Sequence, residues 1–149
     1  MSAPEFASRP ATAADLPAAA DFLTACGLPA QDLTVEVLAG FKLAFAADGR
    51  LVGLIGLEAF GDTGLLRSLA VAPELRGQGL GEQLLERCEA EARRAGLSAL
   101  YLLTTTAADY FRRRAYDDVP RETVPAAIAA HAQFRNLCPS SARCLRKAL

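Results

Sequence analysis

The chain has 149 residues, of which 52% are hydrophobic and 22% are charged. This composition is typical of one soluble globular domain over residues 1–149 that buries a core without disulfides. A net charge of −1 and a pI of about 5.8 argue against a nucleic-acid binder, whose surface should be basic. Residues 1–10 lack the apolar segment of a secretory signal, and no apolar run is long enough to cross a bilayer. We therefore expect a cytoplasmic monomer or homodimer with reduced thiols and without nucleic-acid or membrane partners.

The first half of the chain predicts helices that alternate with antiparallel strands. Thr12 followed by Asp15 is a capping-box pattern, which predicts a helix to about Cys26 that Gly27 and Pro29 end. The other elements expected here are a strand over 5–9, a helix over 32–38, a hairpin of strands over 41–46 and 51–60 around the turn Asp48-Gly49, and a strand over 65–71.

The second half predicts a crossover helix followed by a parallel strand. Apolar residues recur with the period of one buried helix face after residue 79, and Gly96 ends that helix. A strand over 98–103 reached by this crossover should pair parallel with the strand over 65–71. Thr106 and Asp109 form a second capping-box pattern, which predicts a helix to about Arg114. Further elements are a strand over 116–121, a helix over 125–133 and a closing strand over 142–147. The helix that follows residue 79 is expected to bury Leu80, Leu84, Leu85, Cys88 and Ala92. Its solvent-exposed face is expected to carry Glu82, Glu86, Glu89, Arg93 and Arg94.

The turn between the strand over 65–71 and the long helix has the features of an anion site. It contains Arg76 and three glycines in the order Arg-Gly-x-Gly-x-Gly. Glycines allow close backbone approach and positive φ, and a helix N-terminus presents unbonded N–H groups and a positive dipole end. A P-loop would need a lysine after the glycines, and a Rossmann turn would need Gly-x-Gly-x-x-Gly. The spacing predicts a different pyrophosphate-binding turn.

The pattern Val-x-Pro-x-x-Arg-Gly-x-Gly-Leu-Gly in residues 71–81 resembles the acyl-CoA-binding motif of the GNAT superfamily of N-acetyltransferases. Residues 107–116 are similar to the helix of the form Ala-x-x-Leu-Tyr-x-x-x-Gly-Phe that follows the fifth strand in these proteins. The resemblance covers residues 5–119 in element order. A narrower resemblance, to small N-acetyltransferases of bacterial arsenic-resistance operons, rests on the Leu-Leu-Arg-Ser-Leu strand, the Thr-Thr-Thr run and the Leu-Cys-Pro-Ser-Ser-Ala tail.

Two residues depart from the family pattern. The position of the frequent catalytic tyrosine is Phe111, which cannot donate a proton to a leaving thiolate. The glycine before the final aromatic Tyr116 is Ala115, so a positive φ there would be strained. The missing tyrosine, together with the absence of a compelling base, leaves open whether the chain is an enzyme or a non-catalytic acyl-CoA-binding module.

The resemblance implies an α/β (α+β) GNAT fold, a twisted mixed sheet of six or seven strands with helices on both faces. It also implies acetyl transfer from acetyl-CoA, as cosubstrate, to a primary amine by direct attack. We expect the acceptor to be a small amino-acid-like molecule. Backbone N–H groups near Leu69 and Val71 would polarise the thioester carbonyl. Modification of protein amines is a third possibility. The residues expected to bind acetyl-CoA are Leu69, Ala70, Val71, Arg76, Gly77, Gln78, Gly79, Leu80, Gly81, Thr105 and Phe111.

The acceptor amine must lose a proton before it attacks, so the reaction calls for a base and can use an acid. Glu58, near the end of a strand, is the best candidate base, and Asp62 is a weaker one. His131, the single histidine, titrates in a suitable range but is expected to have a surface or capping role. Tyr110 is the candidate acid, although it should point about 100° away from Phe111 on the same helix. Tyr101 and Tyr116 are more typical of core or rim positions.

Arginines and cysteines complete the candidates. Arg67 interrupts an apolar strand, and a buried charge needs a partner. It therefore either pairs with an internal carboxylate such as Glu58 or binds a substrate carboxylate through two parallel hydrogen bonds. Arginines 112–114 could reach the 3′-phosphate of CoA, but a solvated helix face is the simpler expectation. Cys138 and Cys144 match no standard zinc spacing, so we expect no metal site.

Overall fold

The structure is a computed structural model that describes residues 6–28, 30–131, 134 and 141–149. Its strands and helices follow in the order β1 (Ala7–Pro10), α1 (Leu16–Ala25), α2 (Val35–Leu38), β2 (Phe41–Phe45), β3 (Leu51–Phe60), β4 (Thr63–Val71), α3 (Leu80–Arg94), β5 (Ala99–Thr104), α4 (Ala108–Arg112), β6 (Asp117–Asp118), α5 (Ala126–Ala129) and β7 (Arg143–Ala148). None of the described helices is long and apolar enough to span a membrane.

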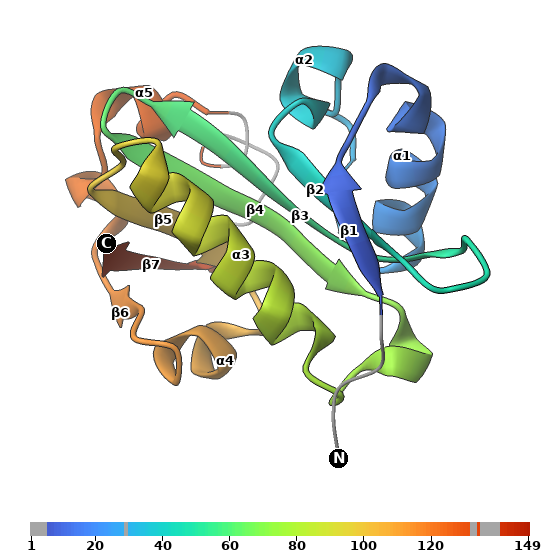
Figure 1. Ribbon diagram of the computed structural model, residues 1–149. Coiled ribbons are helices and arrows are strands. Elements are labelled where there is room, and N and C mark those ends of the chain that lie inside the picture. The colour runs from blue at the N-terminus through green and yellow to red at the C-terminus, as the bar shows by residue number, and fades with distance from the viewer. Residues whose placement is uncertain (1–5, 29, 132–133, 135–140) are drawn as a thin grey trace. The chain divides into compact units, whose positions relative to one another are not determined.

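The strands form one mixed sheet in the order β1-β2-β3-β4-β5-β7-β6 (Figure 1). β1, β2 and β3 pair antiparallel, and the turn between β2 and β3 contains Gly49 at a φ of +87°. β4 pairs parallel with β5 after the crossover through α3, as expected for a strand–helix–strand connection. β7 returns antiparallel to β5, and β6 pairs with β7. The predicted fold class, with seven strands, is confirmed.

The chain divides into two compact units. The first unit consists of Met1–Leu57 and Ser68–Glu91, and the second of Glu58–Arg67 and Ala92–Leu149. The boundary falls within β3, β4 and α3, so each of these elements contributes residues to both units. The single-domain assignment stays a prediction.

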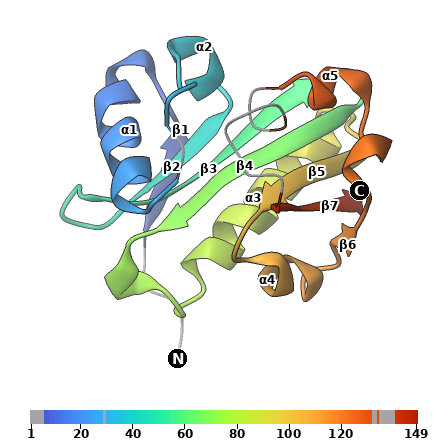
Figure 2. The ribbon, with the colours of Figure 1, turned by 180° about the vertical axis from the view of Figure 1, so that it is seen from behind.

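In the first unit, helices cover both faces of the antiparallel strands. α1 and α2 lie on one face and α3 on the other (Figures 1 and 2). Leu23 of α1 is fully buried in a cluster with Leu43 of β2 and Leu54 of β3. On the opposite face, a Cβ added to Gly53 would lie 3.0 Å from Cδ1 of Leu84 in α3. Successive side chains of β3 thus point to opposite faces of the sheet and pack against both helical layers. Burial of each leucine side chain contributes about 1.5–3 kcal/mol to the stability of the fold.

The helix α3 has the predicted buried face and the predicted stop. Gly96 follows it at a φ of +86°, which glycine adopts without steric cost. The expectation that Glu89 lies on the solvent-exposed face is wrong, because this residue is only 5% exposed. Glu89 follows Leu85 by four residues, so it lies on the buried side of the helix. The buried apolar positions are Leu80, Leu84, Leu85, Cys88 and Ala92.

In the second unit, α5 packs on the part of the sheet that β4, β5 and β7 form. Ile128 of α5 is fully buried in a cluster with Leu65, Ala99 and Cys144. Of the predicted helix over 125–133, the structure describes residues 125–131, in which α5 is a single turn anchored by one large apolar side chain and followed by His131; residues 132 and 133 lie outside the described residues. The predicted strand over 116–121 is also shorter, because β6 pairs with β7 only at Asp117 and Asp118.

The two predicted capping boxes have different outcomes. At the first, the carboxylate of Asp15 accepts the backbone N–H of Thr12 at 2.7 Å, and a 3-10 turn leads into α1. At the second, the prediction is wrong, since α4 begins after Ala107 without a capping side chain. Instead, the hydroxyl of Thr104 accepts the N–H of Ala107 at 3.0 Å. A threonine two residues earlier in the Thr-Thr-Thr run therefore satisfies a backbone donor near the start of this helix.

Candidate functional site

The glycine-rich turn of the first unit carries a row of backbone donors at the start of α3. A 3-10 turn over Pro73–Leu75 follows β4, and Gly77 and Gly79 have φ of +79° and +88°. An L-residue in this left-handed region is strained, whereas glycine is not. These two conformations turn the chain from the strand into the helix within a few residues.

The N–H groups of this turn have no partners within the described turns and loops. The carbonyl of Gly79 accepts the N–H of Gln83 at 3.0 Å, which starts the helical ladder. Among the described residues, none of the turn and loop hydrogen bonds uses an N–H of residues 77–81. N–H groups without such partners at the N-terminus of a 15-residue helix, where the positive end of the helix dipole lies, form the kind of surface that binds phosphate.

Arg76 borders these donors and is held by one hydrogen bond. Its Nε donates to the carbonyl of Val71 at 3.1 Å, and the side chain reaches the solvent. This bond uses Nε alone, so the terminal nitrogens of the guanidinium keep their donors. Gln78 donates to the carbonyl of Glu74 at 3.3 Å, and Glu74 pairs with Arg50 at 2.9 Å. The turn therefore combines backbone donors with one anchored cation.

The end of β4 carries the backbone expected to lie along the thioester. Ser68 has a φ of +63°, which interrupts the extended backbone immediately before Leu69. The pairing of β4 with β5 covers Thr63–Ala99, Gly64–Leu100 and Leu65–Tyr101, and β4 continues beyond it to Val71. A left-handed serine inside a strand is uncommon and marks a local irregularity of the kind found at functional sites.

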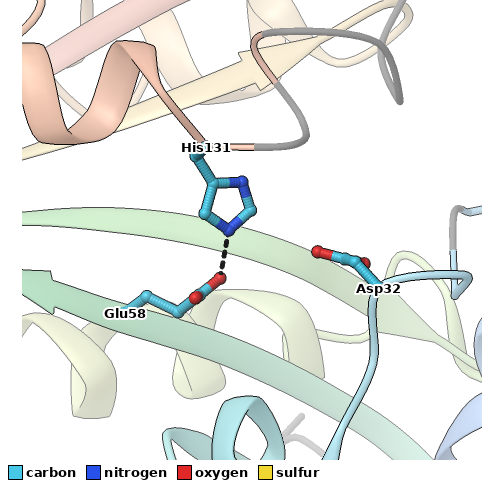
Figure 3. Close-up of side chains that lie close together, drawn as sticks. All are labelled: Asp32, Glu58 and His131. Atoms are coloured by element: carbon cyan, nitrogen blue, oxygen red, sulfur yellow. Dashed lines mark hydrogen bonds and ion pairs between the residues drawn. The ribbon is translucent and has the colours of Figure 1, made fainter.

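In the second unit, Glu58 lies in a polar cluster with His131. Nε2 of His131 is 2.7 Å from Oε2 of Glu58, although the two residues are 73 positions apart (Figure 3). The side chains are 9% and 17% exposed, respectively. The expected surface or capping role of His131 is therefore wrong for its side chain. No local pattern could reveal this contact, because only the packing of α5 on the sheet creates it. Asp32, also drawn in Figure 3, belongs to the first unit.

Arg67 contacts the same carboxylate oxygen. Its Nη1 lies 3.5 Å from Oε2 of Glu58, and its side chain is fully buried. Of the two predicted alternatives, the structure therefore contains the internal pair. A distance of 3.5 Å is at the long end of the hydrogen-bond range, so this contact is looser than that of His131. The role of Arg67 in binding a substrate carboxylate stays a prediction.

The candidate acid Tyr110 and its neighbour Phe111 take different positions on α4. Phe111 is buried and stacks edge-to-face on Tyr116, with ring centroids 5.4 Å apart. Tyr110 is covered by the guanidinium of Arg114, which lies 3.6 Å from the ring centroid. Tyr101 and Tyr116 are buried core residues, as expected. The roles of Tyr110 as acid and of Phe111 in CoA binding stay predictions.

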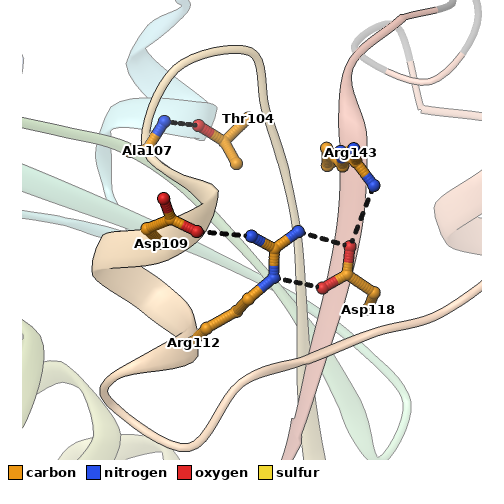
Figure 4. A network of polar contacts seen from close by, with 6 residues as sticks. All are labelled: Thr104, Ala107, Asp109, Arg112, Asp118 and Arg143. Atoms are coloured by element: carbon orange, nitrogen blue, oxygen red, sulfur yellow. Dashed lines mark hydrogen bonds and ion pairs between the residues drawn. The ribbon is translucent and has the colours of Figure 1, made fainter.

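The other polar candidates take part in structural contacts. Arg112 binds Asp118 through two hydrogen bonds of 2.6 and 2.8 Å and contacts Asp109 at 2.6 Å (Figure 4). The hydrogen bonds from Arg112 lower the pKa of Asp118 below its usual range. Asp62 holds Ser98, whose N–H donates to the Asp62 carbonyl at 2.6 Å. Thr105 is the exception: it is exposed immediately after β5, makes none of the described side-chain contacts and stays a predicted CoA-binding residue.

The cysteines within the described residues are free thiols. Burial raises the pKa of Cys88 to about 12 and that of Cys144 to about 11, so both are protonated at neutral pH. Cys26 is half-buried beside the core of the first unit. Cys138, the other cysteine of the C-terminal segment, lies outside the described residues. The expectation that the cysteines hold no metal stays a prediction.

Comparison with known proteins places the fold and both sequence motifs in one family. The model of the acetyltransferase (GNAT) family matches residues 15–117, more than half of the chain. The amino-acid acetyltransferase of Azotobacter vinelandii is 44% identical over 85 residues, which are 56% of this chain and 20% of that protein. The chain thus spans about a fifth of the length of this curated relative.

Solved structures agree on the fold. N-acetylglutamate synthase from Neisseria gonorrhoeae, complexed with coenzyme A and N-acetyl-glutamate, superposes with a TM-score of 0.83 at 24% identity. The superposition covers 97% of this chain and 35% of that one. A Mycobacterium tuberculosis protein in complex with CoA superposes with a TM-score of 0.79 at 22% identity, covering 96% of this chain and 99% of that one. The chain therefore belongs to the acetyltransferase (GNAT) family and has its fold.

Proposed function

We propose that the chain is an acetyl-CoA-dependent N-acetyltransferase that acetylates the primary amine of a small amino-acid-like molecule. The observation that carries this proposal is the turn at residues 76–81. It combines N–H groups without partners in the described turns and loops, the N-terminus of a long helix and an anchored arginine. Two of the superposed structures contain coenzyme A, which has the pyrophosphate that such a turn fits.

The turn would hold the cosubstrate by its phosphates. The N–H groups from Gly77 to Gly81 donate to the pyrophosphate oxygens, and Arg76 adds a charged hydrogen bond. The pantetheine arm then runs along the backbone from Leu69 to Val71, whose N–H groups polarise the thioester carbonyl. Thr105 and Phe111 complete the proposed set of CoA-binding residues.

Glu58 is the proposed base for the acceptor amine. An alkylammonium transfers a proton to Glu58, and the neutral nitrogen attacks the thioester carbonyl carbon. The C–N bond forms, the C–S bond breaks and the CoA thiolate leaves. The second proton of the amine passes to the thiolate, through Tyr110 or through water, and yields the amide and CoA. Phe111 cannot supply that proton, so Tyr110 is the proposed acid on this helix.

An amino-acid-like acceptor would use Arg67 as well as Glu58. The amine and carboxylate of an α-amino acid are attached to the same carbon, and Arg67 lies 3.5 Å from the proposed base. A guanidinium forks a carboxylate with two parallel hydrogen bonds. The Azotobacter vinelandii relative is an amino-acid acetyltransferase, which supports the same acceptor class.

A non-catalytic acyl-CoA-binding module is the second candidate. The observation in its favour is the buried Phe111 where related proteins often have a tyrosine. Such a module would use the turn at residues 76–81 in the same way but would not break the thioester.

Thiol release separates the two candidates. The purified protein is mixed with acetyl-CoA and a panel of amines: amino acids, their amides, polyamines, an amino-bearing arsenical and a lysine peptide. Release of CoA with an amino acid, and formation of the acetylated product by mass spectrometry, supports the proposal. CoA binding without thiol release from any amine identifies a binding module. Preference for the arsenical would instead support the narrower resemblance to arsenic-resistance acetyltransferases.

A further inference from the structure

Two side chains that contact the carboxylate of Glu58 both bind the same one of its two oxygens. Both His131, at 2.7 Å, and Arg67, at 3.5 Å, contact Oε2. A carboxylate oxygen accepts about two hydrogen bonds, so these donors use the capacity of Oε2. Neither contact uses Oε1. The oxygen that takes a proton from an acceptor is therefore the one that these two side chains leave to it.

Several contacts in the second unit hold the histidine in this geometry. The His131 ring stands edge-on to the ring of Phe60 at 87°, with centroids 6.1 Å apart. Its backbone N–H donates to the carbonyl of Ile128 at 2.9 Å. Ile128 is fully buried, so the turn that carries His131 is anchored in the core. The ring is thus fixed by packing on β3 and by the backbone after α5.

We propose that His131 is a positioning residue that fixes Glu58 for proton transfer by donating from Nε2 to Oε2. The proposal rests on the proposed acetyltransfer with Glu58 as base. To donate here, the neutral ring carries its proton on Nε2. The hydrogen bond restricts rotation of the carboxylate, which would otherwise have to be ordered in each catalytic cycle. His131 itself does not touch the acceptor in this role.

The first test separates the hydrogen bond from the packing of the ring. His131→Phe keeps a ring against Phe60 and removes the donor. Loss of one charged hydrogen bond should lower kcat about 10- to 100-fold, with little change in the KM for acetyl-CoA. His131→Gln, which retains a donor, should recover part of the loss. Leu23→Ala, in the core of the first unit, destabilises the fold without touching this segment, so it should lower the melting temperature but keep kcat.

A double-mutant cycle shows whether His131 acts through Glu58. Glu58→Gln removes the base but keeps the size of the side chain. If His131 serves only to position Glu58, adding His131→Phe to Glu58→Gln lowers kcat no further. Multiplied losses would mean that His131 acts independently, which overturns the positioning role. A wild-type kcat in Glu58→Gln would reject Glu58 as base, and with it this role.

The hydrogen bond also has a readout that does not depend on turnover. His131 is the only histidine of the chain, so untagged protein gives one set of imidazole resonances. The Nε2 proton should appear as a slowly exchanging NMR resonance that moves upfield and exchanges faster in Glu58→Gln. An unchanged resonance in that variant, or a kcat retained in His131→Phe, overturns the proposal while leaving acetyltransfer intact. Absence of thiol release from the wild type rejects the proposed function itself.

Discussion

At Ala115 the chain places an L-residue where the backbone is left-handed, with a φ of +73°. Glycine adopts this conformation without the clash between Cβ and the carbonyl oxygen. Ala115→Gly should therefore raise the free energy of unfolding by about 0.5–1 kcal/mol, after the entropy of the unfolded glycine is subtracted. Urea unfolding measures the change.

The matched control for Ala115 is Ala90, in the middle of α3. Ala90→Gly makes the same substitution where φ is helical, so it should destabilise the protein by about 0.5–1 kcal/mol. A gain in the free energy of unfolding for Ala115→Gly and a loss for Ala90→Gly would support backbone strain at Ala115. A loss of stability in Ala115→Gly would contradict it.

The buried Arg67 gives the second prediction. Arg67→Leu leaves Glu58 without one of its two donors and should lower the free energy of unfolding by about 1–3 kcal/mol. If Arg67 also binds the acceptor carboxylate, the KM for the acceptor should rise about 10- to 100-fold while the affinity for CoA stays the same. A variant that melts early but keeps its acceptor KM would show that Arg67 is only structural.

Single residues were predictable to different degrees. The conflict at Ala115 and the pairing of Arg67 with Glu58 could be anticipated, because each followed from a local rule about glycine or buried charge. The contact of His131 with Glu58 could not, since it depends on how a one-turn helix packs on strands distant in the sequence. Glu89 was expected on the solvent-exposed face of α3 because it is charged. Its position four residues after Leu85 places it on the buried face instead.

Among the elements, the turn before α3 should account for CoA binding. Gly77 has a φ of +79°, and an added Cβ would meet nothing within 4 Å. Gly77→Ala therefore costs backbone strain without a clash and should move the N–H groups of the turn, lowering CoA affinity about tenfold. Arg76→Ala, which removes a charged donor, should lower it about 10- to 100-fold. Isothermal titration calorimetry with CoA measures both.

Two substitutions outside the turn serve as matched controls. Gly49 has a φ of +87° and equally open surroundings, but it lies between β2 and β3. Arg50 is exposed and pairs with Glu74. Gly49→Ala and Arg50→Ala should therefore leave CoA affinity within about twofold. If all four variants bind CoA like the wild type, the turn at residues 76–81 is not the CoA site.

The order of elements was predictable where hydrophobic periodicity and turn residues agreed. The hairpin at Asp48-Gly49 and the stop of α3 at Gly96 are examples. The start of α4 was not, because Thr104 of the preceding strand bonds Ala107 in place of the expected Thr106 cap. Three adjacent threonines offer the same hydroxyl, and only the bend of the chain selects between them.

For the molecule as a whole, two paired carboxylates predict how stability depends on pH. Hydrogen bonds from Arg9 and Thr12 lower the pKa of Asp15, and those from Arg112 lower the pKa of Asp118. A folded-state pKa below the unfolded value adds stability above about pH 4, which is lost as the pH falls through the folded value. The melting temperature should therefore fall between neutral pH and about pH 2.5.

Asp118→Asn isolates one of these contributions. It should melt below the wild type at neutral pH and lose less on acidification, because its pair with Arg112 no longer titrates. Both effects should shrink at high salt, since the pair is exposed. Melting curves of the two proteins that stay parallel from about pH 7 to about pH 2.5 would contradict this explanation.

The position of the last strand, β7, in the sheet depends on pairing between strands that are distant in the sequence. The crossover rule predicted the parallel pair of β4 and β5, because connections of this kind are almost always made one way. The sequence also indicated a last strand near residues 142–147. Its place between β5 and β6 was not predictable, because hydrogen bonds between strands distant in the sequence leave no local pattern.

The proposed function is acetyl transfer to an acceptor that carries both an amine and a carboxylate. The decisive comparison is the kcat/KM of thiol release with an amino acid and with the primary amide of the same amino acid. The two acceptors offer the same amine, but only one offers a carboxylate for Arg67. We expect about a 10- to 100-fold preference for the free carboxylate. Equal rates for the pair, or no thiol release from any amino acid, would contradict the proposal.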